Sequence, residues 1–235
     1  MMLEVQNIHT YYGQSHILQG VSLQVDKGKI VLLSGRNGAG KTTTIRSIIG
    51  LVPPRFGEIT FLGEKITGIP VHHVSQKGIS LVPEGRKIIP GLTVYENLKI
   101  ATLKNRDKTR VEALLDQISQ IFPRLRERWD QEGTSLSGGE QQMLAIARAL
   151  VSDPVLMLID EPSEGLSPIM VEKISEVLRE IKNQGMTILL VEQNTDMALD
   201  ISSRCYLMDE GVIKFEGSPE EIKGNEEIQR EYLAI

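Results

Sequence analysis

The stretch GRNGAGKT, residues 35–42, decides the fold, because it lies between an apolar run, KIVLLS, and a segment that continues as a helix from Lys41. A loop of this composition between a strand and a helix fits the P-loop pattern. Its glycines let successive backbone N–H groups turn inward around phosphate oxygens, and the helix N-terminus adds a favourable dipole. The stretch therefore predicts a nucleotide site, in which Lys41 reaches the terminal phosphates and Thr42 holds Mg²⁺. The residues expected to contact the nucleotide are Gly35, Asn37, Gly38, Ala39, Gly40, Lys41, Thr42 and Thr43.

Short apolar runs alternate with longer helical patterns along most of the chain. This alternation predicts an α/β fold with a mostly parallel sheet and helices on both of its faces. Together with the glycine-rich loop it indicates a P-loop NTPase core. The runs expected as parallel strands are KIVLLSG, GISLVP, VLMLID, TILLVEQ and CYLMDEG.

Two parts of the chain depart from this alternation. The N-terminal runs LEVQNI, ILQGVSLQV and EITFLG are separated by turn residues, so we expect an antiparallel β layer beside the parallel core. Between residues 93 and 151 the pattern is helical throughout, which predicts a helical subdomain inserted into the core. The expected organisation is a single domain, residues 1–235, with 1–92 and 152–235 forming the α/β core and 93–151 forming the helical subdomain.

Charge and composition limit the partners and the compartment. The net charge of -5 and the pI near 5.5 argue against nucleic acid as a partner, since phosphate contacts need clustered Lys and Arg. The single cysteine, Cys205, cannot form an internal disulfide, which fits a reducing compartment and a place in the core. No signal peptide is evident, and the apolar runs are shorter than the roughly 20 residues of a membrane helix. We therefore expect a cytoplasmic protein that reaches a membrane only through a partner.

The run VLMLIDE, residues 155–161, ends in two adjacent carboxylates. In a chain that also carries a P-loop, Asp160 is expected to bind Mg²⁺ through water, and Glu161 is expected to position or deprotonate the attacking water. The alternative is that these acidic residues merely end a strand, as they commonly do. The presence of the P-loop favours the catalytic interpretation.

The stretch LSGGEQQ, residues 136–142, allows two interpretations. Ser137 and Glu140 have the spacing of a capping box at the start of a helix, which would be a structural role. Gly138 and Gly139, however, weaken a helix start and uncover its N–H groups, which we expect only where an anion approaches closely.

Together, GRNGAGKT, LSGGEQQ and VLMLIDEP, in this order and spacing, resemble the nucleotide-binding subunits of ABC transporters over essentially the whole chain. The resemblance implies ATP and Mg²⁺ as cofactors. It also implies that two such subunits pair head to tail, so that ATP on one P-loop is closed over by Ser137, Gly138 and Gly139 of the partner. Tyr12 is then expected to stack on adenine, a type of contact worth ~1 to 3 kcal/mol. The alternative is a tyrosine that only packs.

Three positions depart from the general pattern of the family. The chain has Glu84 in LVPEGR where most members have glutamine, Ser167 in SEGLSP where aspartate is usual, and Gln193 in VEQN where histidine usually contacts the terminal phosphate. The resemblance places Glu84 at the metal, beside Thr42 and Asp160. These departures are similar to one branch of the family, the short ATPase subunit of branched-chain amino acid importers and the related urea and short-amide importers.

That branch implies a set of partners. They are a second ABC ATPase subunit, two membrane permease subunits, and an extracytoplasmic solute-binding protein. The two ATPase subunits form a heterodimer in the complex, with a homodimer as the alternative in isolation. The expected location is peripheral, on the cytoplasmic face of the membrane. ABC ATPases that act on DNA are a distant alternative, since they carry long coiled coils between the P-loop and LSGGEQQ, whereas Gly35 and Leu136 are only 101 positions apart here.

Gln193 is the third of the expected catalytic residues, with Glu161 and Lys41. Its amide can donate a hydrogen bond to a phosphate oxygen but cannot carry charge. We therefore expect the site to turn over more slowly than one with histidine. The alternative is that Gln193 caps a helix beginning near Asn194, although Asn194 is the better capping residue.

Overall fold

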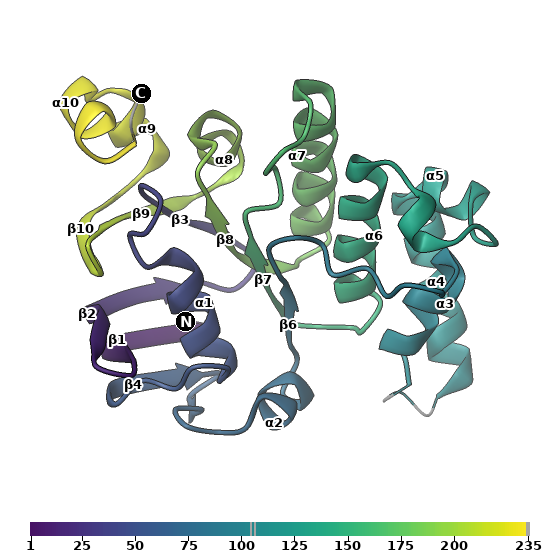
Figure 1. The fold of residues 1–235 in the computed structure, drawn as a ribbon, viewed down its shortest axis with the longest axis horizontal. Helices are drawn as coiled ribbons and strands as arrows, with labels where there is room; N and C mark the ends of the chain where they lie inside the picture. The colour runs from purple at the N-terminus through teal and green to yellow at the C-terminus, as the bar shows by residue number, and fades with distance from the viewer. Residues whose placement is uncertain (104, 106, 234–235) are drawn as a thin grey trace.

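The chain forms two β-sheets and a set of helices, shown in Figure 1. The computed structural model describes residues 1–103, 105 and 107–233. The larger sheet has the strand order β10-β9-β3-β8-β7-β6, and all neighbours are parallel except β10 and β9. The prediction of a mostly parallel sheet is confirmed. Its strands are β10 (Val212–Gly217), β9 (Arg204–Asp209), β3 (Ile30–Ser34), β8 (Thr187–Glu192), β7 (Leu156–Asp160) and β6 (Ile79–Val82).

The smaller sheet is antiparallel and is built from the N-terminal part of the chain, as predicted. Its order is β2-β1-β4-β5, with β2 (Ser15–Val25), β1 (Leu3–Tyr12), β4 (Phe56–Phe61) and β5 (Glu64–Lys65). Figure 1 shows it at the lower left, with α1 (Lys41–Ile49) between it and the larger sheet. The buried side chains of α1 join those of both sheets in one apolar cluster.

The larger sheet is buried on both faces, which explains why its strands are continuous apolar runs. In β3, Val31 and Leu33 face the cluster that contains α1, whereas Ile30 and Leu32 face the helices on the opposite side. These helices include α7 (Pro168–Asn183) and α8 (Thr195–Ile201). Cys205 also lies in this second cluster, as predicted for a core residue, and burial raises the pKa of its thiol to about 12.

Helices dominate the part of the chain for which a helical subdomain is predicted. Figure 1 shows them together at the right, beyond α7. They are α3 (Val94–Ala101), α4 (Lys108–Ile121), α5 (Pro123–Glu127) and α6 (Gly138–Leu150), with a short 3-10 turn, η1, at Gly133–Ser135. The remaining helices are α2 (Val71–Gln76), α9 (Pro219–Lys223), α10 (Glu226–Ile228) and the π-helical turn η2 (Gln229–Leu233). Among the described residues, no helix is both long enough and apolar enough to cross a membrane.

Three neighbouring parallel strands end at the same edge of the larger sheet. The register pairs Ser34 at the end of β3 with Glu192 at the end of β8, and Asp160 at the end of β7 with Val191. The P-loop, Glu161 and Gln193 follow these strand ends directly. An open α/β sheet binds its ligands at this carboxyl edge, so the topology brings together residues that are far apart in the sequence.

Candidate nucleotide and catalytic site

The P-loop presents an open helix N-terminus. Helix α1 begins at Lys41 after Gly40, whose φ is 111°, and no side chain caps this end with a hydrogen bond. A Cβ placed on Gly38, where φ is 82°, would meet no heavy atom within 4 Å. The first N–H groups of α1 and the space beside Gly38 can therefore receive an anion such as a phosphate.

Gly35 has a packing reason for being glycine. A Cβ there would lie 2.1 Å from the carbonyl oxygen of Met208 in β9, so only glycine fits. Ala39 is likewise buried, at 3% exposure, in the apolar cluster around α1. Both residues pack the loop against the core, whereas residues 36–38 between them are exposed.

Lys41 is buried and held at the centre of the loop. Its Nζ donates to the carbonyl oxygens of Gly35, at 2.9 Å, and Arg36, at 3.2 Å. It also lies 3.3 Å from Oε1 of Glu161. The ammonium group is therefore already positioned over the loop, and a bound phosphate would compete with Glu161 for it.

Most of the predicted site residues line one cavity of about 400 Å³. The cavity brings together the P-loop, the carboxylate after β7 and the residue after β8. Its lining residues are Ile17, Asn37, Gly38, Gly40, Lys41, Thr42, Thr43, Glu84, Glu161, Glu164 and Gln193. Gln193 thus lines the same cavity as the P-loop, and the role of its amide stays a prediction.

The residues predicted to bind Mg²⁺ lie together next to this cavity. The Thr42 hydroxyl donates to Oδ1 of Asp160 at 3.1 Å. Burial raises the pKa of Asp160 to about 6, and the nearby charges of Glu161 and Glu84 add to this effect. The Thr42 hydroxyl and the Asp160 carboxylate, with two further carboxylates nearby, suit Mg²⁺. This ion commonly combines one or two carboxylates with phosphate and water ligands.

Glu161 sits in a strained backbone position. Its φ is 45°, in the left-handed region that residues other than glycine rarely adopt, and its N–H donates to the carbonyl oxygen of Val191 at 2.9 Å. Strain of this kind persists where the surrounding structure fixes the residue, and it concentrates at active sites. The backbone of β8 therefore helps to aim the Glu161 carboxylate at the P-loop.

The family model for ABC transporters matches residues 18–164, which is more than half of the chain. The chain belongs to the ABC transporter family. It is therefore an ABC-type ATPase, and ATP is the nucleotide that it binds.

Relatives of known role align with the chain over its whole length. BraG of Pseudomonas aeruginosa, a high-affinity branched-chain amino acid transport ATP-binding protein, is 41% identical over 232 residues, which are 99% of each chain. LptB of Haemophilus influenzae, a lipopolysaccharide export system ATP-binding protein, is 36% identical and covers 99% of this chain and 97% of its own. A solved ATP-binding cassette of an ABC transporter superposes with a TM-score of 0.87 at 29% identity and covers 100% of this chain and 98% of that one.

The ABC signature stretch LSGGEQQ begins α6, and the structure bears out its capping-box interpretation. Ser137 and Glu140 form the predicted capping box, and Glu140 also pairs with Arg128 at 3.1 Å. Gly139 also has a packing reason for being glycine, since a Cβ there would lie 2.4 Å from Cε of Met170. Of the described residues that line the cavity around Lys41, none is Ser137, Gly138 or Gly139. Contact with a nucleotide on a partner subunit stays a prediction for these residues.

Tyr12 lies beside the cavity around Lys41, not in it. It is 42% exposed, its hydroxyl lies 3.5 Å from Nη1 of Arg46, and it lines a neighbouring cavity with Glu84 and Asp160. Tyr11 meets different neighbours, since its ring stacks on His16 at 4.2 Å. An exposed ring at this place is available to a base, and adenine stacking remains a prediction for Tyr12.

The loop after β6 has an unusual backbone. Gly85, Arg86 and Lys87 have φ values of 75°, 63° and 49°, so three consecutive residues are left-handed. Arg148 of α6 donates to the carbonyl oxygen of Lys87 at 2.7 Å and to that of Arg86 at 3.2 Å. The loop that carries Glu84 is thus tied to the signature helix.

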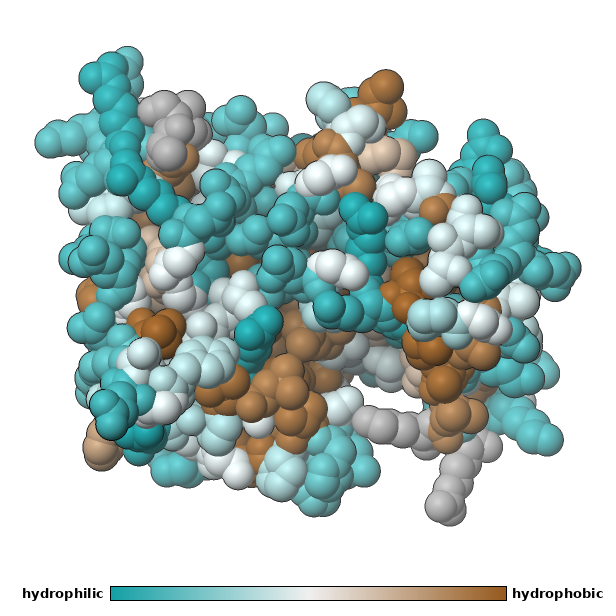
Figure 2. Space-filling view, viewed as in Figure 1, coloured by the Kyte–Doolittle hydropathy of each residue, from teal (hydrophilic) through white to brown (hydrophobic). Residues whose placement is uncertain are grey.

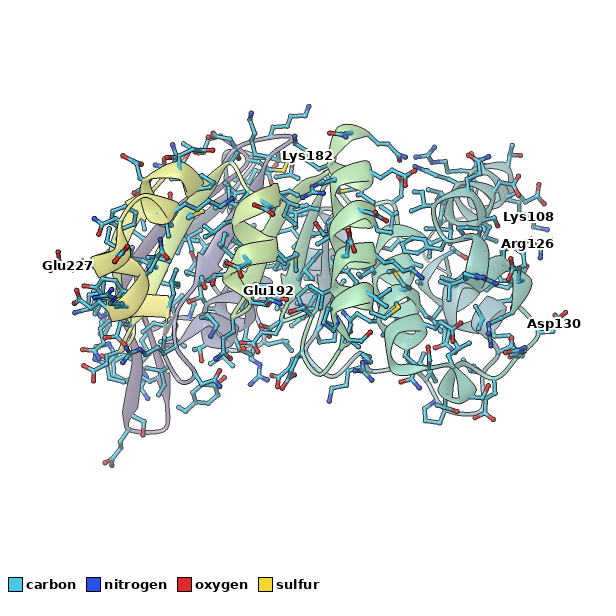
Figure 3. All side chains as sticks on the ribbon, turned by 90° about the horizontal axis from the view of Figure 1, so that it is seen from above. Lys108, Arg126, Asp130, Lys182, Glu192 and Glu227 are labelled. Carbon is cyan, nitrogen blue, oxygen red and sulfur yellow. The ribbon has the colours of Figure 1, made fainter. Side chains whose placement is uncertain are left out.

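Sequence reasoning missed the role of Glu192, which is labelled in Figure 3. This side chain is 1% exposed, and its carboxylate accepts backbone N–H groups from Ser163 at 2.8 Å, Gln193 at 2.9 Å and Asn194 at 3.0 Å. Burial raises its pKa, while these hydrogen bonds oppose the rise. Asn194 begins α8 without a side-chain cap, so Glu192 is the residue that organises this helix start. A carboxylate at the end of an otherwise apolar strand is the sequence signal for such a role.

Replacing Glu192 by alanine should destabilise the protein. Three backbone N–H groups would lose their acceptor in a buried place, which costs about 1 to 3 kcal/mol for an unsatisfied group. Glu192→Gln should also destabilise, because its NH₂ would take the place of one of the two accepting oxygens and face at least one of these N–H donors. Urea denaturation of both variants measures the change, and the exposed Glu176→Gln on α7 is the matched control. Unfolding free energies equal to that of the wild type would contradict the assigned role.

Proposed function

We propose that the chain is the ATP-hydrolysing subunit that powers an ABC importer of branched-chain amino acids. The observation that supports this most is that two of the branch-specific positions, Glu84 and Gln193, both line the cavity around Lys41. The full-length similarity to BraG points the same way. Urea or short amides are the alternative substrates, and the similarity to LptB makes lipopolysaccharide export a second candidate.

In the proposed reaction each group of the cavity has one task. The N–H groups at the start of α1 and the Lys41 ammonium bind the phosphates, while Tyr12 stacks on adenine. Thr42, Asp160 and Glu84 would hold Mg²⁺, which supplies charge stabilisation at the phosphate oxygens. Glu161 accepts the proton of the attacking water, and the Gln193 amide donates to an oxygen of the γ-phosphate.

The proposed assembly is a pair of ABC ATPase subunits bound to two membrane permease subunits and served by an extracytoplasmic solute-binding protein. The second ATPase subunit is a different chain in the complex. Ser137, Gly138 and Gly139 close over ATP on that second subunit. The protein then lies peripherally on the cytoplasmic face of the membrane.

A groove between the α/β core and the helical subdomain is the proposed docking place for a membrane subunit. It encloses about 990 Å³ between the side of α2 and β6 and that of α3 and α6. Ile89, Ile100 and Leu103 give it an apolar wall, and Leu103 is 73% exposed. Figure 2 shows hydrophobic surface on both sides of this recess. A short apolar helix of a permease subunit fits this chemistry.

The stretch LVPEGRKIIPGLTVYENL, residues 81–98, also predicts a docking surface for a membrane subunit, with Ile88, Ile89 and Leu92 as its apolar floor, and this stays a prediction. Ile88 packs toward the apolar core, and its Cγ2 lies 2.9 Å from where a Cβ on Gly133 would be. Among the described lining residues only Ile89 of the three is present. The left-handed turn at residues 85–87 sets which side chains of the loop face the groove.

A cysteine at Leu103 should crosslink to a membrane permease subunit in the intact complex. The reason is that this side chain projects into the groove at 73% exposure. Phe56→Cys, on the antiparallel sheet and 64% exposed, is the matched control and should give no such product. Crosslinks from Leu103→Cys that reach only the second ATPase subunit would place the docking surface elsewhere.

Gln193→Ala should lower ATP turnover by roughly ten- to a hundredfold with little change in ATP affinity, because hydrogen bonds to charged groups are worth ~1.5 to 3 kcal/mol. Gln193→His should keep or raise turnover, since it restores a donor that can carry charge. Steady-state hydrolysis with the partner's own site inactivated measures both. If turnover is indifferent to both substitutions, Gln193 is only part of a helix start.

The substrate is tested on the complex isolated from membranes. ATP hydrolysis by the reconstituted complex, with its solute-binding protein, should rise when leucine, isoleucine or valine is added. Stimulation by urea or short amides instead would favour the alternative importers. If the complex copurifies with lipopolysaccharide and none of these solutes stimulates its ATP hydrolysis, the importer assignment is wrong.

A further inference from the structure

A second, smaller cavity adjoins the ATP site. Its volume is about 110 Å³, and it lies where the loop after β6, the first turns of α6 and the segment after β7 meet. Glu161 lines both this cavity and the one around Lys41, so it connects them. The lining residues are Gly85, Arg86, Gln141, Gln142, Glu161 and Glu164.

Gln142 brings an unpaired donor to this cavity. Its side chain is 4% exposed, and its Nε2 has no hydrogen-bond partner among the residues that the structure describes. In the same part of the chain, the other buried side-chain nitrogen of this kind is Nε1 of Trp129, whose ring is covered by the guanidinium of Arg126 at 3.9 Å. Buried donors are nearly always paired in native proteins, so an unpaired one beside a reacting group suggests a partner in another state.

The neighbouring glutamine on α6 shows the difference. Gln141 donates from Nε2 to the carbonyl oxygens of Thr134, at 3.1 Å, and Leu136, at 2.9 Å, and so fastens the loop before the helix. That is a structural role, fulfilled in the structure. Gln142, one position on, is more buried and makes no such bond through its Nε2.

Glu161 is the group that lacks a partner once phosphate is bound. In the structure its carboxylate lies 3.3 Å from the Lys41 ammonium. When Lys41 turns to the phosphates, Glu161 loses this ion pair, and the small cavity places a second carboxylate, Glu164, among its neighbours. Arg86 also lines this cavity, with its Nη1 3.0 Å from where a Cβ on Gly138 would be, and no ion pair joins it to Glu161 among the described residues.

We propose that Gln142 is a positioning residue that receives Glu161 from Lys41: its Nε2 donates to the Glu161 carboxylate, directly or through one water, while Lys41 binds the phosphates. A cavity of this volume has room for a rotamer change or a bridging water. The inference rests on the proposed function of Glu161 as the group that handles the attacking water. It adds a residue of the signature helix that holds this carboxylate.

The test is Gln142→Met in the full-length chain, which keeps length and volume but removes the donor. We expect kcat to fall about tenfold with KM for Mg-ATP nearly unchanged, because a hydrogen bond to a charged group is lost after ATP is bound. The melting temperature should stay equal or rise, since a buried unpaired donor is removed. Gln117→Met is the matched control. Gln117 lies on α4, and its Nε2 donates to Oε1 of Gln184 at 2.8 Å. Its replacement should not change kcat.

A double-mutant cycle separates the possible failures. In a Glu161→Gln background, Gln142→Met should cause no further loss of single-turnover rate, because the carboxylate that it holds is gone. Full turnover by Glu161→Gln alone would refute the proposed function of Glu161. Suppose that Glu161→Gln loses turnover as expected. A wild-type kcat in Gln142→Met would then overturn the role of Gln142 and leave that of Glu161 intact. Losses that multiply in the double variant would do the same. Gln142→Glu provides a second variant, in which repulsion of Glu161 should lower kcat further than methionine does.

Discussion

Glu161→Gln is expected to reduce ATP turnover by about 10²- to 10⁴-fold, the usual contribution of a group that handles a proton in the transition state. Glutamine has the size of glutamate but cannot accept the proton of the attacking water. ATP binding should remain, because the P-loop N–H groups and Lys41 are unchanged. Lys41 would also lose its carboxylate partner, now 3.3 Å away, and so be freer to meet the phosphates.

The measurement pairs steady-state hydrolysis with equilibrium binding of Mg-ATP, using a complex in which the partner ATPase is disabled. Glu176→Gln, an exposed glutamate on α7, controls for the loss of one negative charge. Unchanged hydrolysis in Glu161→Gln would refute the assignment. If Glu161→Gln loses ATP binding as well as hydrolysis, Glu161 instead maintains the conformation of the P-loop.

Asp160→Asn is expected to abolish Mg²⁺-dependent hydrolysis and yet to stabilise the chain without nucleotide. The carboxylate is 3% exposed and its pKa is raised to about 6 from 3.8, chiefly by burial. The folded protein therefore binds this proton more tightly than the unfolded chain does. Above pH 6 the ionised carboxylate costs the fold up to about 3 kcal/mol, and this cost disappears as the pH falls below 3.8. Asparagine removes the cost and can still accept from Thr42.

Thermal denaturation across pH tests the stability part of this prediction. At pH 7 the variant should melt higher than the wild type, and the difference should shrink as the pH is lowered toward 4. Hydrolysis measured with and without Mg²⁺ tests the other part, with an expected loss of at least about a hundredfold from a missing metal ligand. A variant that melts lower than the wild type at pH 7 would show that the Asp160 carboxylate supports the fold.

The sequence predicts the fold and most of the site because both depend on local patterns. Apolar runs predict the parallel strands, and strand ends predict that the P-loop, Asp160 and Gln193 meet at one edge. Contacts between side chains of different segments at that edge leave no pattern in the local sequence. The three N–H groups that Glu192 accepts come from two different segments. The direction of Ile88 depends on a left-handed turn in which Arg86 is not glycine, and the crowding of Gly139 comes from Met170 on another helix.

The buried thiol of Cys205 makes this protein well suited to site-specific labelling. The thiolate is the form that attacks maleimides and other thiol reagents, and burial raises the pKa of this thiol to about 12, so it reacts slowly at neutral pH. Because this is the one cysteine of the chain, introduced cysteines should react alone without its removal. A fluorophore pair placed on α4 and on the antiparallel sheet would then report, in single molecules, how the helical subdomain moves relative to the α/β core during an ATP cycle.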